Sequence, residues 1–182
     1  MHTHFNIRQP RHKVFVSYHH ANDQAYREHF EALFSDHYDI LDSQSVQIGD
    51  IDLYLNTDRI RQRIRDEYLR NSTVTVVLLG TETWKRKHVD WEIAASIRET
   101  KFNPRSGLIG IFLPSHPDFG NFKYNPANCP PRLVDNVKCG FAKLYNWNDT
   151  PGNVQQWIHD AYDRRKVITP DNSHPSYAKN RS

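Results

Sequence analysis

The stretch of sequence that decides the fold is VTVVLLG at residues 74–80. A continuous β-branched run without polar alternation indicates a strand that is buried on both faces, as in a parallel sheet. Before it, Ile60, Ile64 and Tyr68 share one face of an expected helix, and a further helix is expected over about residues 88–100. This helix–strand–helix order is typical of βαβ units.

The same alternation of strands and helices extends over the rest of the chain. Further strands are predicted at residues 13–18, 108–113 and 141–147, with a weak one near 51–55. Helix starts are indicated by capping residues, which are Asn22 or Asp23, Thr57 or Asp58, and Thr150 followed by Pro151. Residues 114–140 contain five prolines and are expected to form a long loop. The pattern predicts an α/β fold with a mostly parallel sheet.

Composition indicates a soluble, intracellular, single-domain protein. The chain has 182 residues, with 24 Lys and Arg against 21 Asp and Glu, and its 12% of aromatic residues argues against disorder. We expect neither a membrane span nor a secretory signal, because long apolar runs are missing. Two cysteines suit a reducing cytosol, so a cytoplasmic location is expected. The folded domain is expected at residues 13–166, with a flexible segment at 1–12 and a poorly ordered tail at 167–182.

Several common chemistries are excluded by motifs that the sequence lacks. It has no G-x-G-x-x-G fingerprint, no P-loop lysine after a glycine, no H-E-x-x-H and no G-x-S-x-G. A phospho-accepting receiver domain is excluded because the acidic residues that it needs after the first and third strands are missing. Cys129 and Cys139 do not form a Cys-x-x-C pair, so we expect no metal site.

Polar and aromatic side chains follow two strands whose carboxyl ends are expected to meet at one edge of the sheet. They are Ser17, Tyr18, His19 and His20 after the first strand, and Thr81, Glu82, Thr83 and Trp84 after the strand at 74–79. Glu92 lies in the first turns of the following helix, next to Trp91. Ligands of open parallel sheets bind at the carboxyl edge, so these residues form the candidate site.

Four pieces of the chain together resemble the TIR-like domain of the bacterial Thoeris anti-phage signalling type. They are VFVSYH at residues 14–19, the helix-to-strand block at 60–80, TETW at 81–84, and the helix segment at 89–97 that contains VDWEI. The resemblance extends from about Lys13 to Lys166, although its last third matches only in the order of elements. The sequence departs from the family at His88, where a tryptophan usually precedes the catalytic glutamate by four residues.

The resemblance implies a flavodoxin-like three-layer sandwich with a mostly parallel central sheet of about five strands. It also implies cleavage of the nicotinamide–ribose bond of NAD, which is the substrate, with no further cofactor. Glu92 is then the catalytic residue, whose carboxylate stabilises an oxocarbenium-like transition state and is kept ionised by the positive end of its helix. The substrate-binding residues are then Ser17, Tyr18, His19, Thr81, Trp84 and Trp91.

The resemblance implies partners as well. Thoeris-like members resemble enzymes that make a cyclic ADP-ribose-type signal for a downstream effector, and TIR domains associate with one another. Residues 14–56 carry eight acidic side chains and one basic, whereas residues 57–88 carry eight basic and four acidic. We therefore expect the acidic third of one copy to meet the basic helix of another. The alternative function is a non-catalytic TIR scaffold that acts through such homotypic contacts.

Each candidate residue also has a plainer structural interpretation. Glu92 is alternatively an ordinary first-turn glutamate that interacts with the helix dipole. Trp91 is alternatively a partly buried core residue. Tyr18 alternatively covers the end of the sheet. Trp84 alternatively covers the helix that follows it.

Two further features remain open. His19 and His20 are either acid–base groups, since histidine titrates near neutral pH, or exposed loop residues. The arginine-rich helix face at residues 59–70 is a solvated surface in the favoured interpretation and a nucleic-acid site in the other.

Overall fold

A sheet of five parallel strands lies at the centre of the molecule. The computed structural model describes residues 11–37, 39–40 and 56–182. The strands are β1 (Lys13–Ser17), β2 (Asp39–Ile40), β3 (Val74–Leu79), β4 (Gly107–Phe112) and β5 (Ala142–Asn146). Their order is β2-β1-β3-β4-β5, and every neighbouring pair is parallel. This is the flavodoxin-like order, in agreement with the fold that the family resemblance implies.

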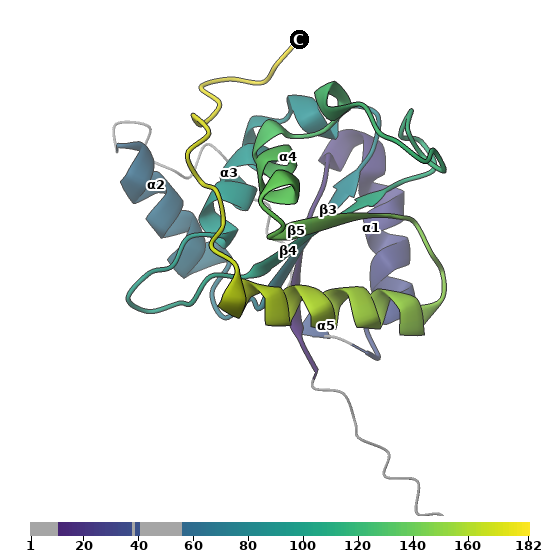
Figure 1. The fold of residues 1–182 in the computed structure, drawn as a ribbon, viewed down its shortest axis with the longest axis horizontal. Coiled ribbons are helices and arrows are strands. Elements are labelled where there is room, and N and C mark those ends of the chain that lie inside the picture. The colour runs from purple at the N-terminus through teal and green to yellow at the C-terminus, as the bar shows by residue number, and fades with distance from the viewer. Residues whose placement is uncertain (1–10, 38, 41–55) are drawn as a thin grey trace, which may run out of the picture.

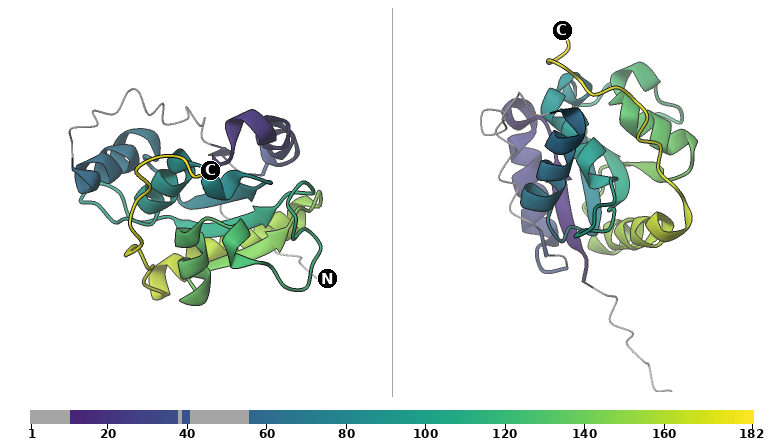
Figure 2. Two further views of the ribbon diagram at one scale, coloured as in Figure 1. Left: turned by 90° about the horizontal axis from the view of Figure 1, so that it is seen from above. Right: turned by 90° about the vertical axis from the view of Figure 1, so that its left-hand side faces the viewer.

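Helices cover both faces of the sheet and give the molecule three layers (Figures 1 and 2). They are α1 (His20–Phe34), α2 (Thr57–Arg63), α3 (Lys87–Ser96), α4 (Pro131–Lys138) and α5 (Pro151–Val167). Side chains of α1 and α5 form one core with β1, β3 and β4, and those of α3 and α4 pack on the opposite face. Every residue of β3 is buried, which explains its continuous apolar run. None of these described helices is long and apolar enough to cross a membrane.

The first helix begins earlier than predicted. α1 begins at His20, whereas the sequence marks Asn22 or Asp23 as its cap. The carbonyl of His19 accepts the N–H groups of both of these residues, at 3.2 and 2.9 Å, so His19 takes the capping position. The weak strand predicted near residues 51–55 lies outside the described residues.

α4 lies inside residues 114–140, which the sequence predicts to be a long loop. That prediction was wrong because the prolines start the helix instead of preventing it. Pro131 occupies the first helical position, where a missing N–H costs no hydrogen bond. Leu133 and Val134 of the next turn are then buried against β3 and β4.

The arginine-rich helix face is only partly a solvated surface. A π-helical turn (Ile64–Tyr68) follows α2, and within it Arg65 is fully buried. Its guanidinium donates to the carbonyl of Leu69 at 2.8 Å and to the hydroxyl of Ser72 at 2.7 Å. Arg65 therefore holds the turn before β3 in place and is not available to a polyanion.

The end of the chain packs against the domain, whereas the sequence predicts a poorly ordered tail at residues 167–182. Residues 171–181, which we call the C-terminal strap, leave α5 and pass over α4 and α3 (yellow in Figure 1). Asn172 donates to the carbonyl of Ala94 at 2.9 Å, and Tyr177 is buried. The prediction failed because the polar side chains of the strap find their partners far away in the sequence.

The opposite end of the sheet holds a pair of histidines, of which His12 is buried and His159 is partly exposed. Residues 1–10 of the predicted flexible segment 1–12 lie outside the described residues, but His12 is buried. Its Nε2 lies 3.1 Å from Nδ1 of His159 on α5. His12 is therefore fixed by the domain at the point where β1 begins.

Candidate active site

The end of β1 and the middle of α3 bring two predicted site residues together. Ser17 is the last residue of β1 and pairs in register with Val77 of β3. Its hydroxyl donates to Oε2 of Glu92 at 2.6 Å, which is a short hydrogen bond. Both residues are 1% exposed. The serine and the glutamate therefore form a buried pair at the carboxyl edge of the sheet.

The buried position changes the acidity of the glutamate. Burial raises the pKa of Glu92 to about 8, and the Ser17 hydroxyl opposes part of that rise. This contradicts the expectation that the helix dipole keeps Glu92 ionised. Glu92 is the sixth residue of α3, whereas the dipole acts within the first turn, so desolvation dominates. Such perturbed carboxyl groups are typical of functional sites.

A group of histidines lies next to the pair. His88 precedes Glu92 by four residues, so the two lie on the same side of α3. Nε2 of His88 lies 3.0 Å from the carbonyl oxygen of Tyr18, and its ring lies 4.7 Å from that of His20. Burial, with a contribution from His88, lowers the pKa of His20 to about 4. These residues are therefore neutral, packed groups and not exposed loop histidines.

Tyr18 and His19 are adjacent in sequence but differ in environment. Tyr18 is buried in the core with Val16, and its hydroxyl donates to Oε1 of Gln24 at 2.6 Å. It therefore covers the end of the sheet, as its structural interpretation expects. His19 is 6% exposed, and its Nδ1 has no hydrogen-bond partner among the described residues. Burial, assisted by the charge of Arg86, lowers the pKa of His19, so the imidazole is a neutral acceptor.

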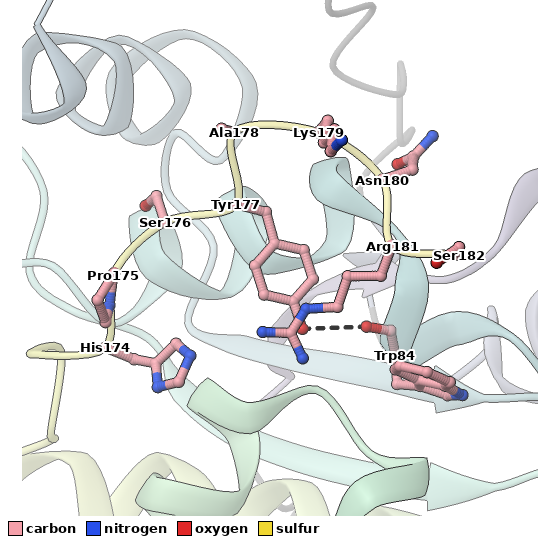
Figure 3. Close-up of a pocket in the computed structure, with 10 residues that line it drawn as sticks. All are labelled: Trp84, His174, Pro175, Ser176, Tyr177, Ala178, Lys179, Asn180, Arg181 and Ser182. Carbon is pink, nitrogen blue, oxygen red and sulfur yellow. Dashed lines mark hydrogen bonds between the residues drawn. The ribbon is translucent and has the colours of Figure 1, made fainter.

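The segment after β3 places its two predicted site residues in different surroundings. Thr81 is exposed, and its Oγ1 donates to the carbonyl of Ser115 at 3.1 Å. Trp84 is partly buried and lines an open cleft of about 760 Å³ together with residues 174–182 (Figure 3). Neither member of the buried Ser–Glu pair lines this cleft.

Asp23 is a second buried carboxylate at this edge, which sequence reasoning considered only as a helix cap. It lies on α1, and burial raises its pKa. Its Oδ2 lies 3.4 Å from Oγ1 of Thr83, and a side chain at Gly80 would collide with it. The feature of the sequence that indicates this carboxylate is Gly80, directly after β3, because only glycine leaves space for the Asp23 side chain.

Trp91 is not brought to the buried pair. It packs in a separate hydrophobic cluster with Ile60 and Ile64, and its Nε1 donates to the carbonyl of Tyr177 at 2.9 Å. Successive residues on a helix point about 100° apart, so Trp91 and Glu92 lie on different sides of α3. This is the arrangement that its interpretation as a core residue expects.

The arrangement offers a buried acid and neutral imidazoles at one edge of a parallel sheet. Within the described ranges, no three His, Cys, Asp or Glu side chains are grouped so that they could hold a metal ion. A carboxyl group and imidazoles can transfer protons, and an ionised carboxylate can stabilise developing positive charge.

Comparison with known proteins identifies the family. The profile of the family described as Thoeris protein ThsB, TIR-like domain, matches residues 15–118, which include Ser17, Asp23 and Glu92. The chain belongs to this TIR-like family. The Thoeris TIR-like domain has its role in anti-phage defence, and the matched range spans β1 to the loop after β4. A comparison with curated proteins finds no match.

Proposed function

We propose that this TIR-like domain cleaves the nicotinamide–ribose bond of NAD and closes the ADP-ribose part into a cyclic signal. The observation that carries the proposal is the buried Ser17–Glu92 hydrogen bond at the carboxyl edge of the sheet. That edge is where open parallel sheets bind ligands, and Glu92 is the carboxyl group that bond cleavage requires. The signal then activates a separate effector in the defence response.

The reaction requires Glu92 in its ionised form, as a carboxylate, and not in its protonated form, as an acid. The C–N bond breaks so that nicotinamide leaves as a neutral molecule with the bonding electron pair, and the ribose becomes cation-like. An ionised Glu92 stabilises this cation. A hydroxyl of the same molecule then attacks the ribose carbon and releases its proton, which gives the cyclic product; attack by water gives ADP-ribose.

Binding of NAD supplies a reason for Glu92 to ionise. The carboxyl has a pKa of about 8 in the protein alone because it is buried. The nicotinamide ring of NAD carries a positive charge, and a nearby positive charge favours the ionised carboxylate. The substrate that needs the carboxylate therefore helps to create it.

Access to Glu92 requires a rearrangement. The residue is 1% exposed, and the cleft at Trp84 does not reach it. We propose that association of TIR-like domains opens the site, so that isolated copies turn over slowly. Ser17 and the neutral His19 are the groups proposed to contact the ribose phosphate part of NAD, and Trp84 and Thr81 lie at the outer edge of that path.

The test is release of nicotinamide by the purified protein, with and without an extract of infected cells. Separation of the products by chromatography and mass spectrometry distinguishes cyclic from open ADP-ribose. Glu92→Gln keeps the shape of the side chain but cannot become negative, so we expect at least a 100-fold loss of turnover, since such electrostatic groups are commonly worth about that much. Glu99→Gln makes the same change at an exposed side chain and is the matched control.

The sealed position of Glu92 also favours one alternative, a non-catalytic scaffold that acts through TIR–TIR contacts. The two functions differ in what Glu92→Gln does to protection against phage. A catalytic domain loses protection with this change, whereas a scaffold keeps it and shows no nicotinamide release under any condition. Intact turnover in Glu92→Gln would contradict the assignment of the catalytic residue.

A further inference from the structure

The C-terminal strap runs antiparallel to α3 along the whole length of that helix. Four hydrogen bonds between 2.8 and 2.9 Å join them, from Asn172 to the Ala94 carbonyl, from the Trp91 indole to the Tyr177 carbonyl, from the Tyr177 amide to Asp90, and from the Lys87 amide to Asn180. A further one, from the Arg181 amide to the carbonyl of Lys85 at 2.9 Å, lies just before the helix begins. Residues with higher numbers in the strap bond to residues with lower numbers in the helix. The strap therefore follows the helix from its end to its beginning.

The beginning of α3 lacks a cap of its own. Its N-cap residue, Arg86, makes no capping hydrogen bond with its side chain. The N–H groups of a first helical turn have no partners within the helix and need acceptors from elsewhere. Oδ1 of Asn180 accepts the N–H of Lys87, the first residue of α3, at 2.8 Å. The strap thus supplies the acceptor that the helix itself does not provide.

A buried ion pair anchors the middle of the strap. Nε of Arg132 on α4 donates to Oδ1 of Asp90 at 3.0 Å, and both residues are buried. The same guanidinium donates to Oδ1 of Asn172 at 2.8 Å and to the carbonyl of His174 at 2.6 Å. One arginine therefore joins α3, α4 and the strap. The strap is therefore an integral part of the folded domain.

The strap and the buried Ser–Glu pair contact different sides of the same helix. Val89–Ser96 is buried at every position, because the sheet, α2, α4 and the strap together surround α3. Trp91 donates to the strap at Tyr177, and the next residue, Glu92, accepts from Ser17 of β1. The strap and the buried Ser–Glu pair therefore contact adjacent residues of one helix turn.

We infer that the C-terminal strap positions Glu92 for NAD cleavage, with Asn180 as a positioning residue that caps α3. This inference rests on the function proposed above. Asn180 touches no reacting atom; it fixes the first turn of α3, and through that turn it fixes the direction from which Glu92 meets the ribose. The strap is thus part of the catalytic framework and not a cover that must open.

The experiment compares Asn180→Ala, Asn180→Asp and wild type as full-length chains. Loss of a cap is expected to lower kcat about threefold to tenfold without changing KM, because Glu92 acts on the transition state. Amide hydrogen exchange in the first turn of α3 should become faster to a similar degree. Asn180→Asp keeps an accepting oxygen and should restore both values. Ser173→Ala is the matched control, because its hydroxyl donates to Asp171 within the strap itself.

The outcomes separate this inference from the proposed function. Faster exchange in Asn180→Ala with unchanged kcat would overturn the inference alone, since the cap would then order the helix without affecting the site. A chain that lacks residues 177–182 should lose at least as much activity as Asn180→Ala; higher activity would identify the strap as a cover and overturn the inference. Absence of nicotinamide release from wild type, with protection intact in Glu92→Gln, would overturn both.

Discussion

Glu92 makes the stability of the folded chain depend on pH. Its ordinary pKa of 4.5 rises to about 8 in the fold because the side chain is buried. The folded state therefore binds the proton more tightly than the unfolded state does. This contribution to stability is complete below about pH 4.5 and is lost as the pH rises through about 8.

Glu92→Gln should remove this pH dependence. Glutamine stays neutral, so the variant gains stability over wild type as the pH rises from 5 to 8, by about 2–4 kcal/mol at the upper end. Thermal unfolding at a series of pH values measures the difference. Glu99→Gln, on the surface, should follow the wild-type curve. Parallel curves for wild type and Glu92→Gln would show that Glu92 is not buried as a carboxyl.

At the scale of residues, the sequence predicted which side chains meet better than it predicted how they are packed. It placed Ser17 and Glu92 at one edge of the sheet because parallel strands end there, and the two form a hydrogen bond. It could not tell that Trp91 faces the core, because an aromatic residue next to a candidate site suits both places equally well. Asp23 was missed as a site residue because its partner, Gly80, carries no side chain to suggest a contact.

At the scale of elements, Arg132 is the residue on which three parts of the fold depend. It connects α4 to Asp90 of α3 and to the C-terminal strap. The removal of one partner of a buried ion pair leaves the other charge without compensation in a medium that solvates it poorly.

Arg132→Met should lower the free energy of unfolding by about 3–5 kcal/mol. The melting temperature is then expected to fall by roughly 2–4 °C for each kcal/mol. The double variant Arg132→Met/Asp90→Asn buries no charge and should recover part of the loss. Lys138→Met replaces a solvent-exposed cation at the end of α4 and should have little effect. A single variant as stable as wild type would contradict the role of the ion pair.

The elements differ in how well the sequence predicts them, for physical reasons. The central strands are apolar on both faces, so their hydrophobic runs alone identify them. α4 is short and begins with prolines, which give the same signal in a loop. The strap buries few apolar side chains and depends on side-chain amides and on Arg132, whose partners only the folded chain brings together.

At the scale of the whole molecule, the charge is divided between two parts of the sequence, an acidic one at residues 14–56 and a basic one at 57–88. Some of the basic residues have partners inside the chain: Arg65 is buried, and Lys85 and Arg86 form ion pairs with Glu82. Arg59 and Arg70, by contrast, are exposed. These two are exposed cations that a second copy can reach.

Self-association should therefore weaken as salt rises. Between about 0.05 and 0.5 M salt, screening between exposed charges becomes much stronger, so the association constant should fall. Sedimentation velocity measures it directly. Arg59→Glu/Arg70→Glu should reproduce the effect at low salt, whereas Lys138→Glu, at the end of α4, should not. Association that is independent of salt and of these substitutions would show that charge does not drive it.

The path of the strap has a consequence for protein synthesis. The partners of α3 at residues 172, 177 and 180 leave the ribosome more than seventy residues after the helix itself. A nascent or prematurely terminated chain therefore contains the glutamate but not the segment that holds its helix. The contacts that hold the helix of Glu92 are therefore completed only after the strap has been synthesised.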